Sequence, residues 1–140
     1  MSEIKVDSLT GKTSAGDITV TSEGGAATQS LQQGLAKVWL NFNGTGTIAV
    51  RDSNNVASLS DGGSGTYTVN TTNALSNVNY CVTGIGDDDQ NHNHSFLRSN
   101  ATITTSACPL TTGTGHHSGQ TGGLSIDTGY VNIAIMGDLA

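Results

Sequence analysis

The C-terminal three quarters of the chain alternates apolar and polar positions with a period of two, which is typical of antiparallel β-strands. In the clearest case, apolar side chains fall on one face of each of two strands and an Asn-Gly turn separates them: Val38, Leu40, Phe42, Asn43-Gly44, Ile48 and Val50. Further strands are predicted over residues 56–60, 66–69, 80–83, 96–105 and 130–136. About seven strands between residues 37 and 140 predict an all-β outer domain, an antiparallel β-sandwich.

Residues 1–36 have a different pattern and predict an extended N-terminal arm. Two brief alternations, at 4–7 and 17–21, predict short strands without a core of their own.

A short helix is predicted at the end of the arm, because Ser30 and Gln33 have the spacing of a capping box. Leu31 and Leu35 lie four residues apart and share one face of that helix. They would either close a three-fold contact between copies or cover the end of the downstream sheet.

The composition favours association. Only 34% of the 140 residues are apolar and 4% are aromatic, whereas 19 are glycine. A monomer of this length normally buries roughly 70% of its unfolded surface, which is difficult here unless neighbouring copies contribute area.

The charge pattern argues against nucleic acid as a partner. Five Lys and Arg residues are scattered among 11 Asp and Glu residues, and the net charge is -6. Binding to a phosphate backbone requires clustered basic residues. No apolar run approaches the ~20 residues that span a bilayer, and residues 1–16 do not resemble a signal peptide. We therefore expect a soluble protein made in the cytoplasm.

Four segments carry a resemblance to a known family: the opening Ser2–Gly11, the segment Gly34–Ser53 (GLAKVWLNFNGTGTIAVRDS), the segment Asp61–Tyr80 and the closing strand Tyr130–Gly137. They resemble tail-fibre-like proteins of phages that infect marine bacteria, including cyanobacteria. The resemblance leaves residues 84–129 uncovered.

The resemblance implies a virion structural protein, assembled in the host cytoplasm as a β-rich homotrimer. Its N-terminal part would join other tail or capsid proteins, and its C-terminal domain would face outward toward a host surface glycan or outer-membrane protein. Many relatives are longer chains with a stem, so positions as fibre, fibre tip and capsid decoration all stay open. The family offers no catalytic residues to transfer, and we expect no enzymatic activity.

Two polar, Gly-rich stretches, 84–93 and 111–129, are long enough to be functional loops. The side chains that we expect to face a receptor lie in these two stretches: Asp87, Asp88, Asp89, Asn91, Asn93, His116 and His117.

His92 and His94 are candidate metal ligands, because residues two apart on an extended strand project to the same side. Three chains around an axis would present six imidazole nitrogens, which suits octahedral iron or another transition metal. A similar His-x-His arrangement binds iron in the long tail-fibre tip of the T-even phages. The alternative is a pair of solvent-exposed loop histidines.

Other candidate chemistry is weaker. The carboxylates of 87–89 could hold Ca²⁺ but lack the spacing of a calcium loop, so a solvated acidic loop is the alternative. His116, Ser118 and Asp127 can be written as a hydrolytic triad, yet nothing in the sequence supports their convergence. Cys81 and Cys108 are expected to be buried free thiols.

The sequence leaves three functions to be distinguished. The first is a fibre or receptor-binding component, and the second is a capsid-decorating or tail-scaffold protein. The third is a glycan depolymerase, which would need a paired acid and base that the clustered 87–89 carboxylates do not provide.

Overall fold

The computed structural model describes residues 3–15, 18–87, 101–113 and 125–140. The chain divides into two units, Met1–Leu35 and Ala36–Ala140. No helix in the described part of the chain is long or apolar enough to cross a membrane.

The first unit contains a small hairpin and a helix of four residues. Strand β1 (Thr19–Thr21) pairs antiparallel with β2 (Thr28–Ser30), and helix α1 spans Leu31–Gly34. The Ser30 hydroxyl accepts a hydrogen bond from the Gln33 amide, which confirms the predicted helix start. The strand predicted at 4–7 is wrong for the single chain, because residues 3–6 have no strand partner.

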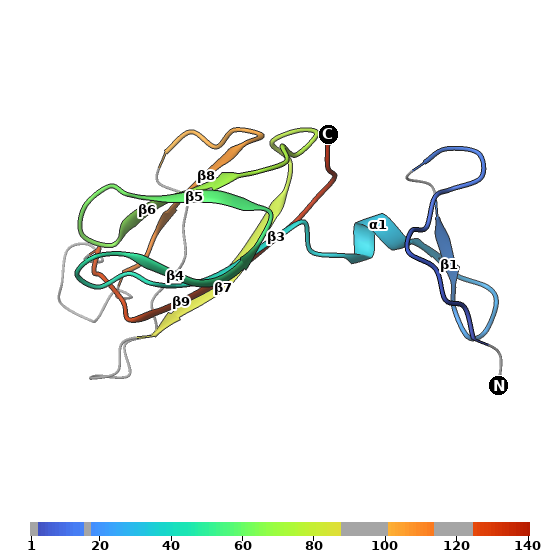
Figure 1. Cartoon of the computed structure of the whole chain (residues 1–140), viewed down its shortest axis with the longest axis horizontal. Coiled ribbons are helices and arrows are strands. Elements are labelled where there is room, and N and C mark those ends of the chain that lie inside the picture. Colours follow the sequence, from blue (N-terminus) through green and yellow to red (C-terminus); the bar gives the residue numbers. More distant parts are fainter. Residues whose placement is uncertain (1–2, 16–17, 88–100, 114–124) are drawn as a thin grey trace. The chain divides into compact units, whose positions relative to one another are not determined.

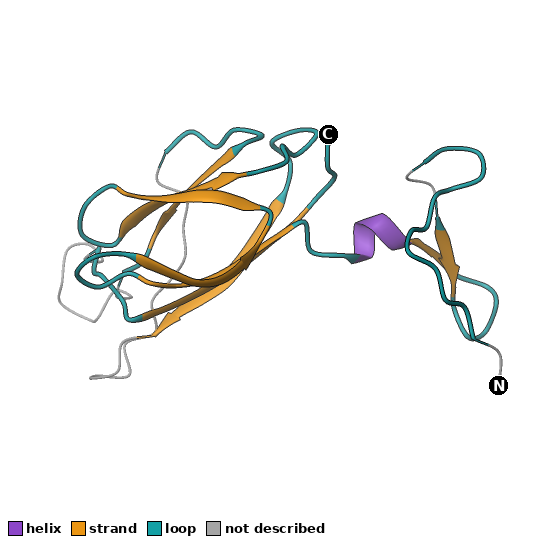
Figure 2. Cartoon of the chain, viewed as in Figure 1, coloured by secondary structure: helices purple, strands orange, loops and turns teal. Residues whose placement is uncertain are grey.

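The second unit has seven strands in its described part: β3 (Val38–Asn43), β4 (Ala49–Asn54), β5 (Val56–Asp61), β6 (Thr66–Thr71), β7 (Cys81–Asp87), β8 (Ala107–Thr111) and β9 (Tyr130–Met136). They form a four-stranded sheet in the order β4-β3-β9-β7 and a three-stranded sheet in the order β5-β6-β8 (Figures 1 and 2). Every pairing is antiparallel. The mainly β, antiparallel architecture is confirmed.

One apolar core joins the two sheets, and strands β3, β6, β8 and β9 supply most of it. Its buried members are Val38, Leu40, Phe42, Tyr67, Val69, Leu75, Cys108, Leu110, Val131, Ile133 and Ile135. Burial of one large aliphatic or aromatic side chain stabilises a fold by about 1.5–3 kcal/mol. Val38, Leu40 and Phe42, which the alternation predicted to share one face of a strand, all belong to this core.

Two strand boundaries differ from those predicted. Residues 84–87, predicted as loop because of their glycines, belong to β7 and pair with β9. The strand predicted over 96–105 is wrong in its described part, 101–105, which is irregular. The observed strand, β8, begins at Ala107 and includes Pro109. A proline, which lacks the N–H group, is tolerated there because β8 is an edge strand.

A single residue, Asn55, carries the chain from the four-stranded sheet to the three-stranded sheet. Its φ of 58° is left-handed, a conformation that asparagine tolerates better than most residues. Its side chain accepts from the Asn73 amide at 2.7 Å and donates to the Asn73 carbonyl at 3.1 Å. This corner thus fixes how the two sheets are connected.

Two substitutions of Asn55 separate the contribution of its left-handed backbone from that of its side-chain hydrogen bonds. Asn55→Gly keeps the backbone conformation but loses both side-chain hydrogen bonds, so we expect the free energy of unfolding to fall by about 1–2 kcal/mol. Asn55→Ala adds left-handed strain and should lower it by roughly 2–4 kcal/mol. Urea unfolding at equal chain concentration measures both, and equal stability of the two variants would contradict this role.

Candidate functional site

Most of the residues predicted to bind a receptor or a metal lie outside the described part of the chain: Asp88, Asp89, Asn91, His92, Asn93, His94, His116 and His117. Asp87 is described in its backbone alone, as the last residue of β7 opposite Tyr130. Among the described residues, no group of three or more His, Cys, Asp or Glu could hold a metal ion. The iron and calcium sites therefore stay predictions.

The described flanks of both predicted loops meet at one end of the Ala36–Ala140 unit, here called the distal end. The Gly44 amide donates to the Thr128 carbonyl at 2.9 Å, and Gly113 forms an isolated bridge with Ser125. Strand β7 also ends here, beside the start of β9.

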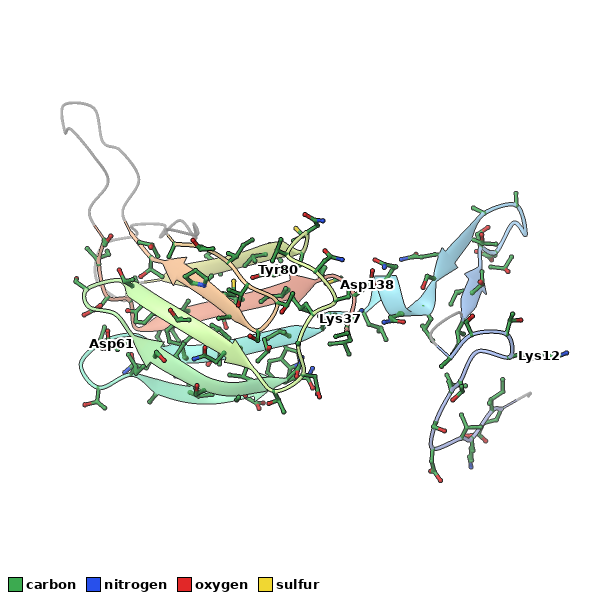
Figure 3. The ribbon with its side chains drawn as sticks, turned by 90° about the horizontal axis from the view of Figure 1, so that it is seen from above. Lys12, Lys37, Asp61, Tyr80 and Asp138 are labelled. Atoms are coloured by element: carbon green, nitrogen blue, oxygen red, sulfur yellow. The ribbon has the colours of Figure 1, made fainter. Side chains whose placement is uncertain are left out.

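The chain enters this unit at the opposite end. Asp61 lies at the distal end, whereas Lys37 and Asp138 lie where the chain enters (Figure 3). The described residues Asp87, Gly113 and Ser125 therefore lie at the end of this unit away from Lys37.

A buried tyrosine ties the turns of the distal end together. The Tyr67 ring is fully buried and packs edge-on against Phe42, with ring centroids 5.0 Å apart. Its hydroxyl lies 3.0 Å from the Gly44 carbonyl oxygen and 3.1 Å from Asp127 Oδ1. The same Asp127 oxygen accepts the Gly65 amide at 2.6 Å. The Tyr67–Asp127 pair thus links three separate turns.

Only glycine fits beside this pair at position 65. The backbone there has φ +62°, and an added Cβ would lie 2.5 Å from the Ile126 nitrogen and the Thr112 oxygen. The close approach lets the Thr112 hydroxyl donate to the Ile126 carbonyl at 2.6 Å. The base of the loop that contains segment 114–124 is therefore held by backbone and side-chain hydrogen bonds.

Burial raises the pKa of the Tyr67 hydroxyl, and the hydrogen bond to the Asp127 carboxylate raises it further. Burial likewise raises the pKa of Tyr80, whose hydroxyl lies 3.2 Å from the Thr104 carbonyl oxygen. Both phenols stay protonated at neutral pH. They act as hydrogen-bond donors within the fold, and neither has the lowered pKa of an activated nucleophile.

The other residues considered for chemistry are Asp127 of the hypothetical triad and the two cysteines. The Asp127 carboxylate of the hypothetical triad is held by Gly65 and Tyr67, while Ser118 and the histidines lie outside the described residues. Both cysteines are free. Cys108 is buried as predicted, and burial raises its pKa, whereas the prediction for Cys81 is wrong because that residue is exposed.

The outer face of the four-stranded sheet carries exposed apolar side chains that sequence reasoning missed. Trp39 is 39% exposed, Tyr130 is 48% exposed and Ile85 is 52% exposed. Between Trp39 and Tyr130, Asn41 donates to the Asn132 side chain. This outer face could have been predicted from Trp39, because an aromatic residue stands there at a position of the strand where the alternation calls for a polar one.

The Arg51 guanidinium strengthens one end of this outer face. It stands 4.4 Å from the centroid of the Tyr130 ring and donates to the Gly129 carbonyl at 2.6 Å. A cation over an aromatic ring contributes about 0.5–1 kcal/mol at an exposed site. Arg51 therefore contacts the start of β9 from the outer face of the sheet.

Comparisons with known proteins give no identification, because no family model, curated protein or solved structure matches the chain.

The raised pKa of Tyr67 predicts a specific loss of stability in alkali. Above about pH 10 a tyrosine of the unfolded chain ionises, whereas buried Tyr67 does not, so the free energy of unfolding should fall as the pH rises. Tyr67→Phe should be less stable at neutral pH by about 1–3 kcal/mol, and its stability should decline less steeply in alkali.

Chemical unfolding at neutral pH and at two alkaline pH values measures both effects. Tyr80→Phe removes the other phenol whose pKa is raised by burial, from a partly buried position, and should make the decline in alkali less steep in the same way. If the free energy of unfolding fell equally steeply with pH in the wild type and in Tyr67→Phe, the raised pKa of Tyr67 would be contradicted.

Proposed function

We propose that this chain is a tail-fibre-like virion structural protein that acts as a homotrimer and contributes to attachment at the host surface. The observation that carries the proposal is the exposure of the apolar side chains of the N-terminal arm: Ile4 84%, Val6 58%, Leu9 60%, Val20 50% and Leu35 54%. None of the described residues of Met1–Leu35 is buried.

An arm of this kind gains its order from other chains. An isolated two-stranded hairpin is marginally stable in water, and so is a helix of four residues. Leaving several aliphatic side chains in solvent forgoes about 25 cal/mol per Å² of the area that association would bury. Copies of the same arm, wrapped about a three-fold axis, or a partner on the particle would supply that burial.

The Ala36–Ala140 unit suits an outward-facing β-sandwich. Its predicted receptor loops start from the distal end, and the arm connects at the other end. The Tyr67–Asp127 pair holds the base of one loop rigidly, which lowers the entropy lost when that loop binds a ligand. Three copies would raise the apparent affinity for a host glycan or outer-membrane protein through avidity.

A capsid-decorating or tail-scaffold protein is the second candidate, since it would use the same exposed arm without a receptor. Immunogold labelling of intact virions distinguishes the two. The fibre proposal expects gold particles at the tail, and labelling of the capsid surface would favour decoration.

The mass of the purified chain tests the association. Light scattering should give three times the 14.2 kDa chain mass. Val20→Asp with Leu35→Asp places two charges on the exposed apolar arm and should lower the mass, because burial of a charge opposes assembly.

Thr19→Asp with Gln33→Asp is the matched control, since it adds the same charge to the arm at exposed polar positions and should leave the trimer intact. A wild-type chain that is folded and monomeric in dilute solution would refute the proposal.

A further inference from the structure

The outer face of the four-stranded sheet β4-β3-β9-β7 carries an ordered set of side chains. Residues 38, 40 and 42 of β3 point into the core, so Trp39 and Asn41 point to the outer face. Residues that pair across an antiparallel ladder share a face. The register therefore adds these side chains to the outer face: Asn54 in line with Trp39, and Asp52, Asn132 and Ile85 in line with Asn41.

Two exposed aromatic rings stand on this face, those of Trp39 and Tyr130. Tyr130 is two residues from Asn132 along β9, so both point to the same side. Trp39 pairs with Ala134, four residues from Tyr130, which separates the two aromatic positions by about 14 Å at ~3.4 Å per residue. Two rings at that separation suit an extended ligand that has several flat apolar surfaces.

Amide side chains lie between the two aromatic positions. The Asn41 side chain donates a hydrogen bond to the Asn132 side-chain oxygen, at an exposed place on the sheet. That bond uses one of the two N–H groups of Asn41 and one lone pair of the Asn132 oxygen, so the pair has further donors and acceptors to offer. A hydroxyl group both donates and accepts, and it can use either kind of group.

The charges of this face favour an uncharged ligand. The Arg51 guanidinium already contacts the Tyr130 ring and the Gly129 carbonyl. Asp52 is acidic, and the chain carries a net charge of -6, which opposes an anionic ligand. A cationic ligand would gain little from one exposed carboxylate, because an exposed ion pair adds little affinity.

A neutral oligosaccharide has the surfaces that such a face would contact. One side of a pyranose ring presents C–H groups, whose slight positive polarisation suits the negative face of an aromatic ring. The rim of the same ring carries hydroxyl groups for the amides. A protein partner would instead be expected to bury a continuous apolar centre, whereas here amides stand between Trp39 and Tyr130.

We propose that the outer face of the four-stranded sheet binds a neutral oligosaccharide. Its sugar rings stack on Trp39 and Tyr130, and its hydroxyl groups form hydrogen bonds with Asn41 and Asn132. The inference deepens the proposed function, on which it rests, by naming the class of ligand used in attachment to the host surface. The contact lies on strands whose backbone is fixed by pairing, which limits the entropy lost on binding.

A fluorescence titration tests the site directly, because Trp39 is the single tryptophan of the chain. The full-length protein is titrated with neutral hexasaccharides of glucose, mannose, galactose and N-acetylglucosamine, and with a hexasaccharide of galacturonic acid as the anionic counterpart. At least one neutral hexasaccharide should change the Trp39 emission in a saturable way. No change with any neutral sugar, or a change with the anionic sugar alone, would overturn the proposal.

Calorimetry with a hexasaccharide that binds then tests the individual contacts. Trp39→Ala and Tyr130→Ala should each weaken binding by roughly tenfold, because each removes a stacking surface. Asn132→Leu removes an amide while adding apolar area, and it should weaken binding by roughly fivefold to tenfold. Tighter binding by Asn132→Leu would indicate apolar adhesion and would overturn the recognition of hydroxyl groups.

Val78→Ala is the matched control, since it removes an exposed apolar side chain from the segment between β6 and β7 and should leave the affinity unchanged. Urea unfolding of each variant shows that it is folded. Equal affinity of the wild type and Trp39→Ala would overturn the site. Light scattering measures association separately, so a trimer that binds no sugar would refute the site alone, and a monomer that binds it through Trp39 would refute the trimer alone.

Discussion

The burial of apolar side chains between two small sheets is the constraint on which the rest of the molecule depends. Strands β3, β6, β8 and β9 supply most of that core, and the turns of the distal end are tied to it through Tyr67. Nothing comparable exists in the described part of Met1–Leu35, where every apolar side chain is at least partly exposed. The Ala36–Ala140 unit thus has its own apolar core, whereas the described part of Met1–Leu35 has none.

Sequence reasoning succeeded where local periodicity decides the structure. The alternation of residues 38–42 predicted the central strand, and Ser30 predicted the helix start, because each signal lies within a few residues. It failed where a strand forms because it pairs with a strand far away in the sequence. The glycines at the end of β7 predicted a loop, and Pro109 argued against a strand at β8, yet both segments pair with distant strands. The Tyr67–Asp127 pair was not predictable either, since 60 residues separate its members and only the fold brings them together.

The proposed function follows from this division of the chain. A β domain with its own apolar core, joined to an arm of exposed aliphatic residues, is what we would expect of a particle component whose arm assembles and whose β domain makes contacts.

We propose that folding of this chain is completed by association with identical chains. Association stabilises a folded state by mass action, so the thermal unfolding of the chain should depend on its concentration. The unfolding midpoint should rise steadily as the chain concentration is raised over a hundredfold range. A midpoint that stays constant over that range, with a single cooperative transition, would contradict it.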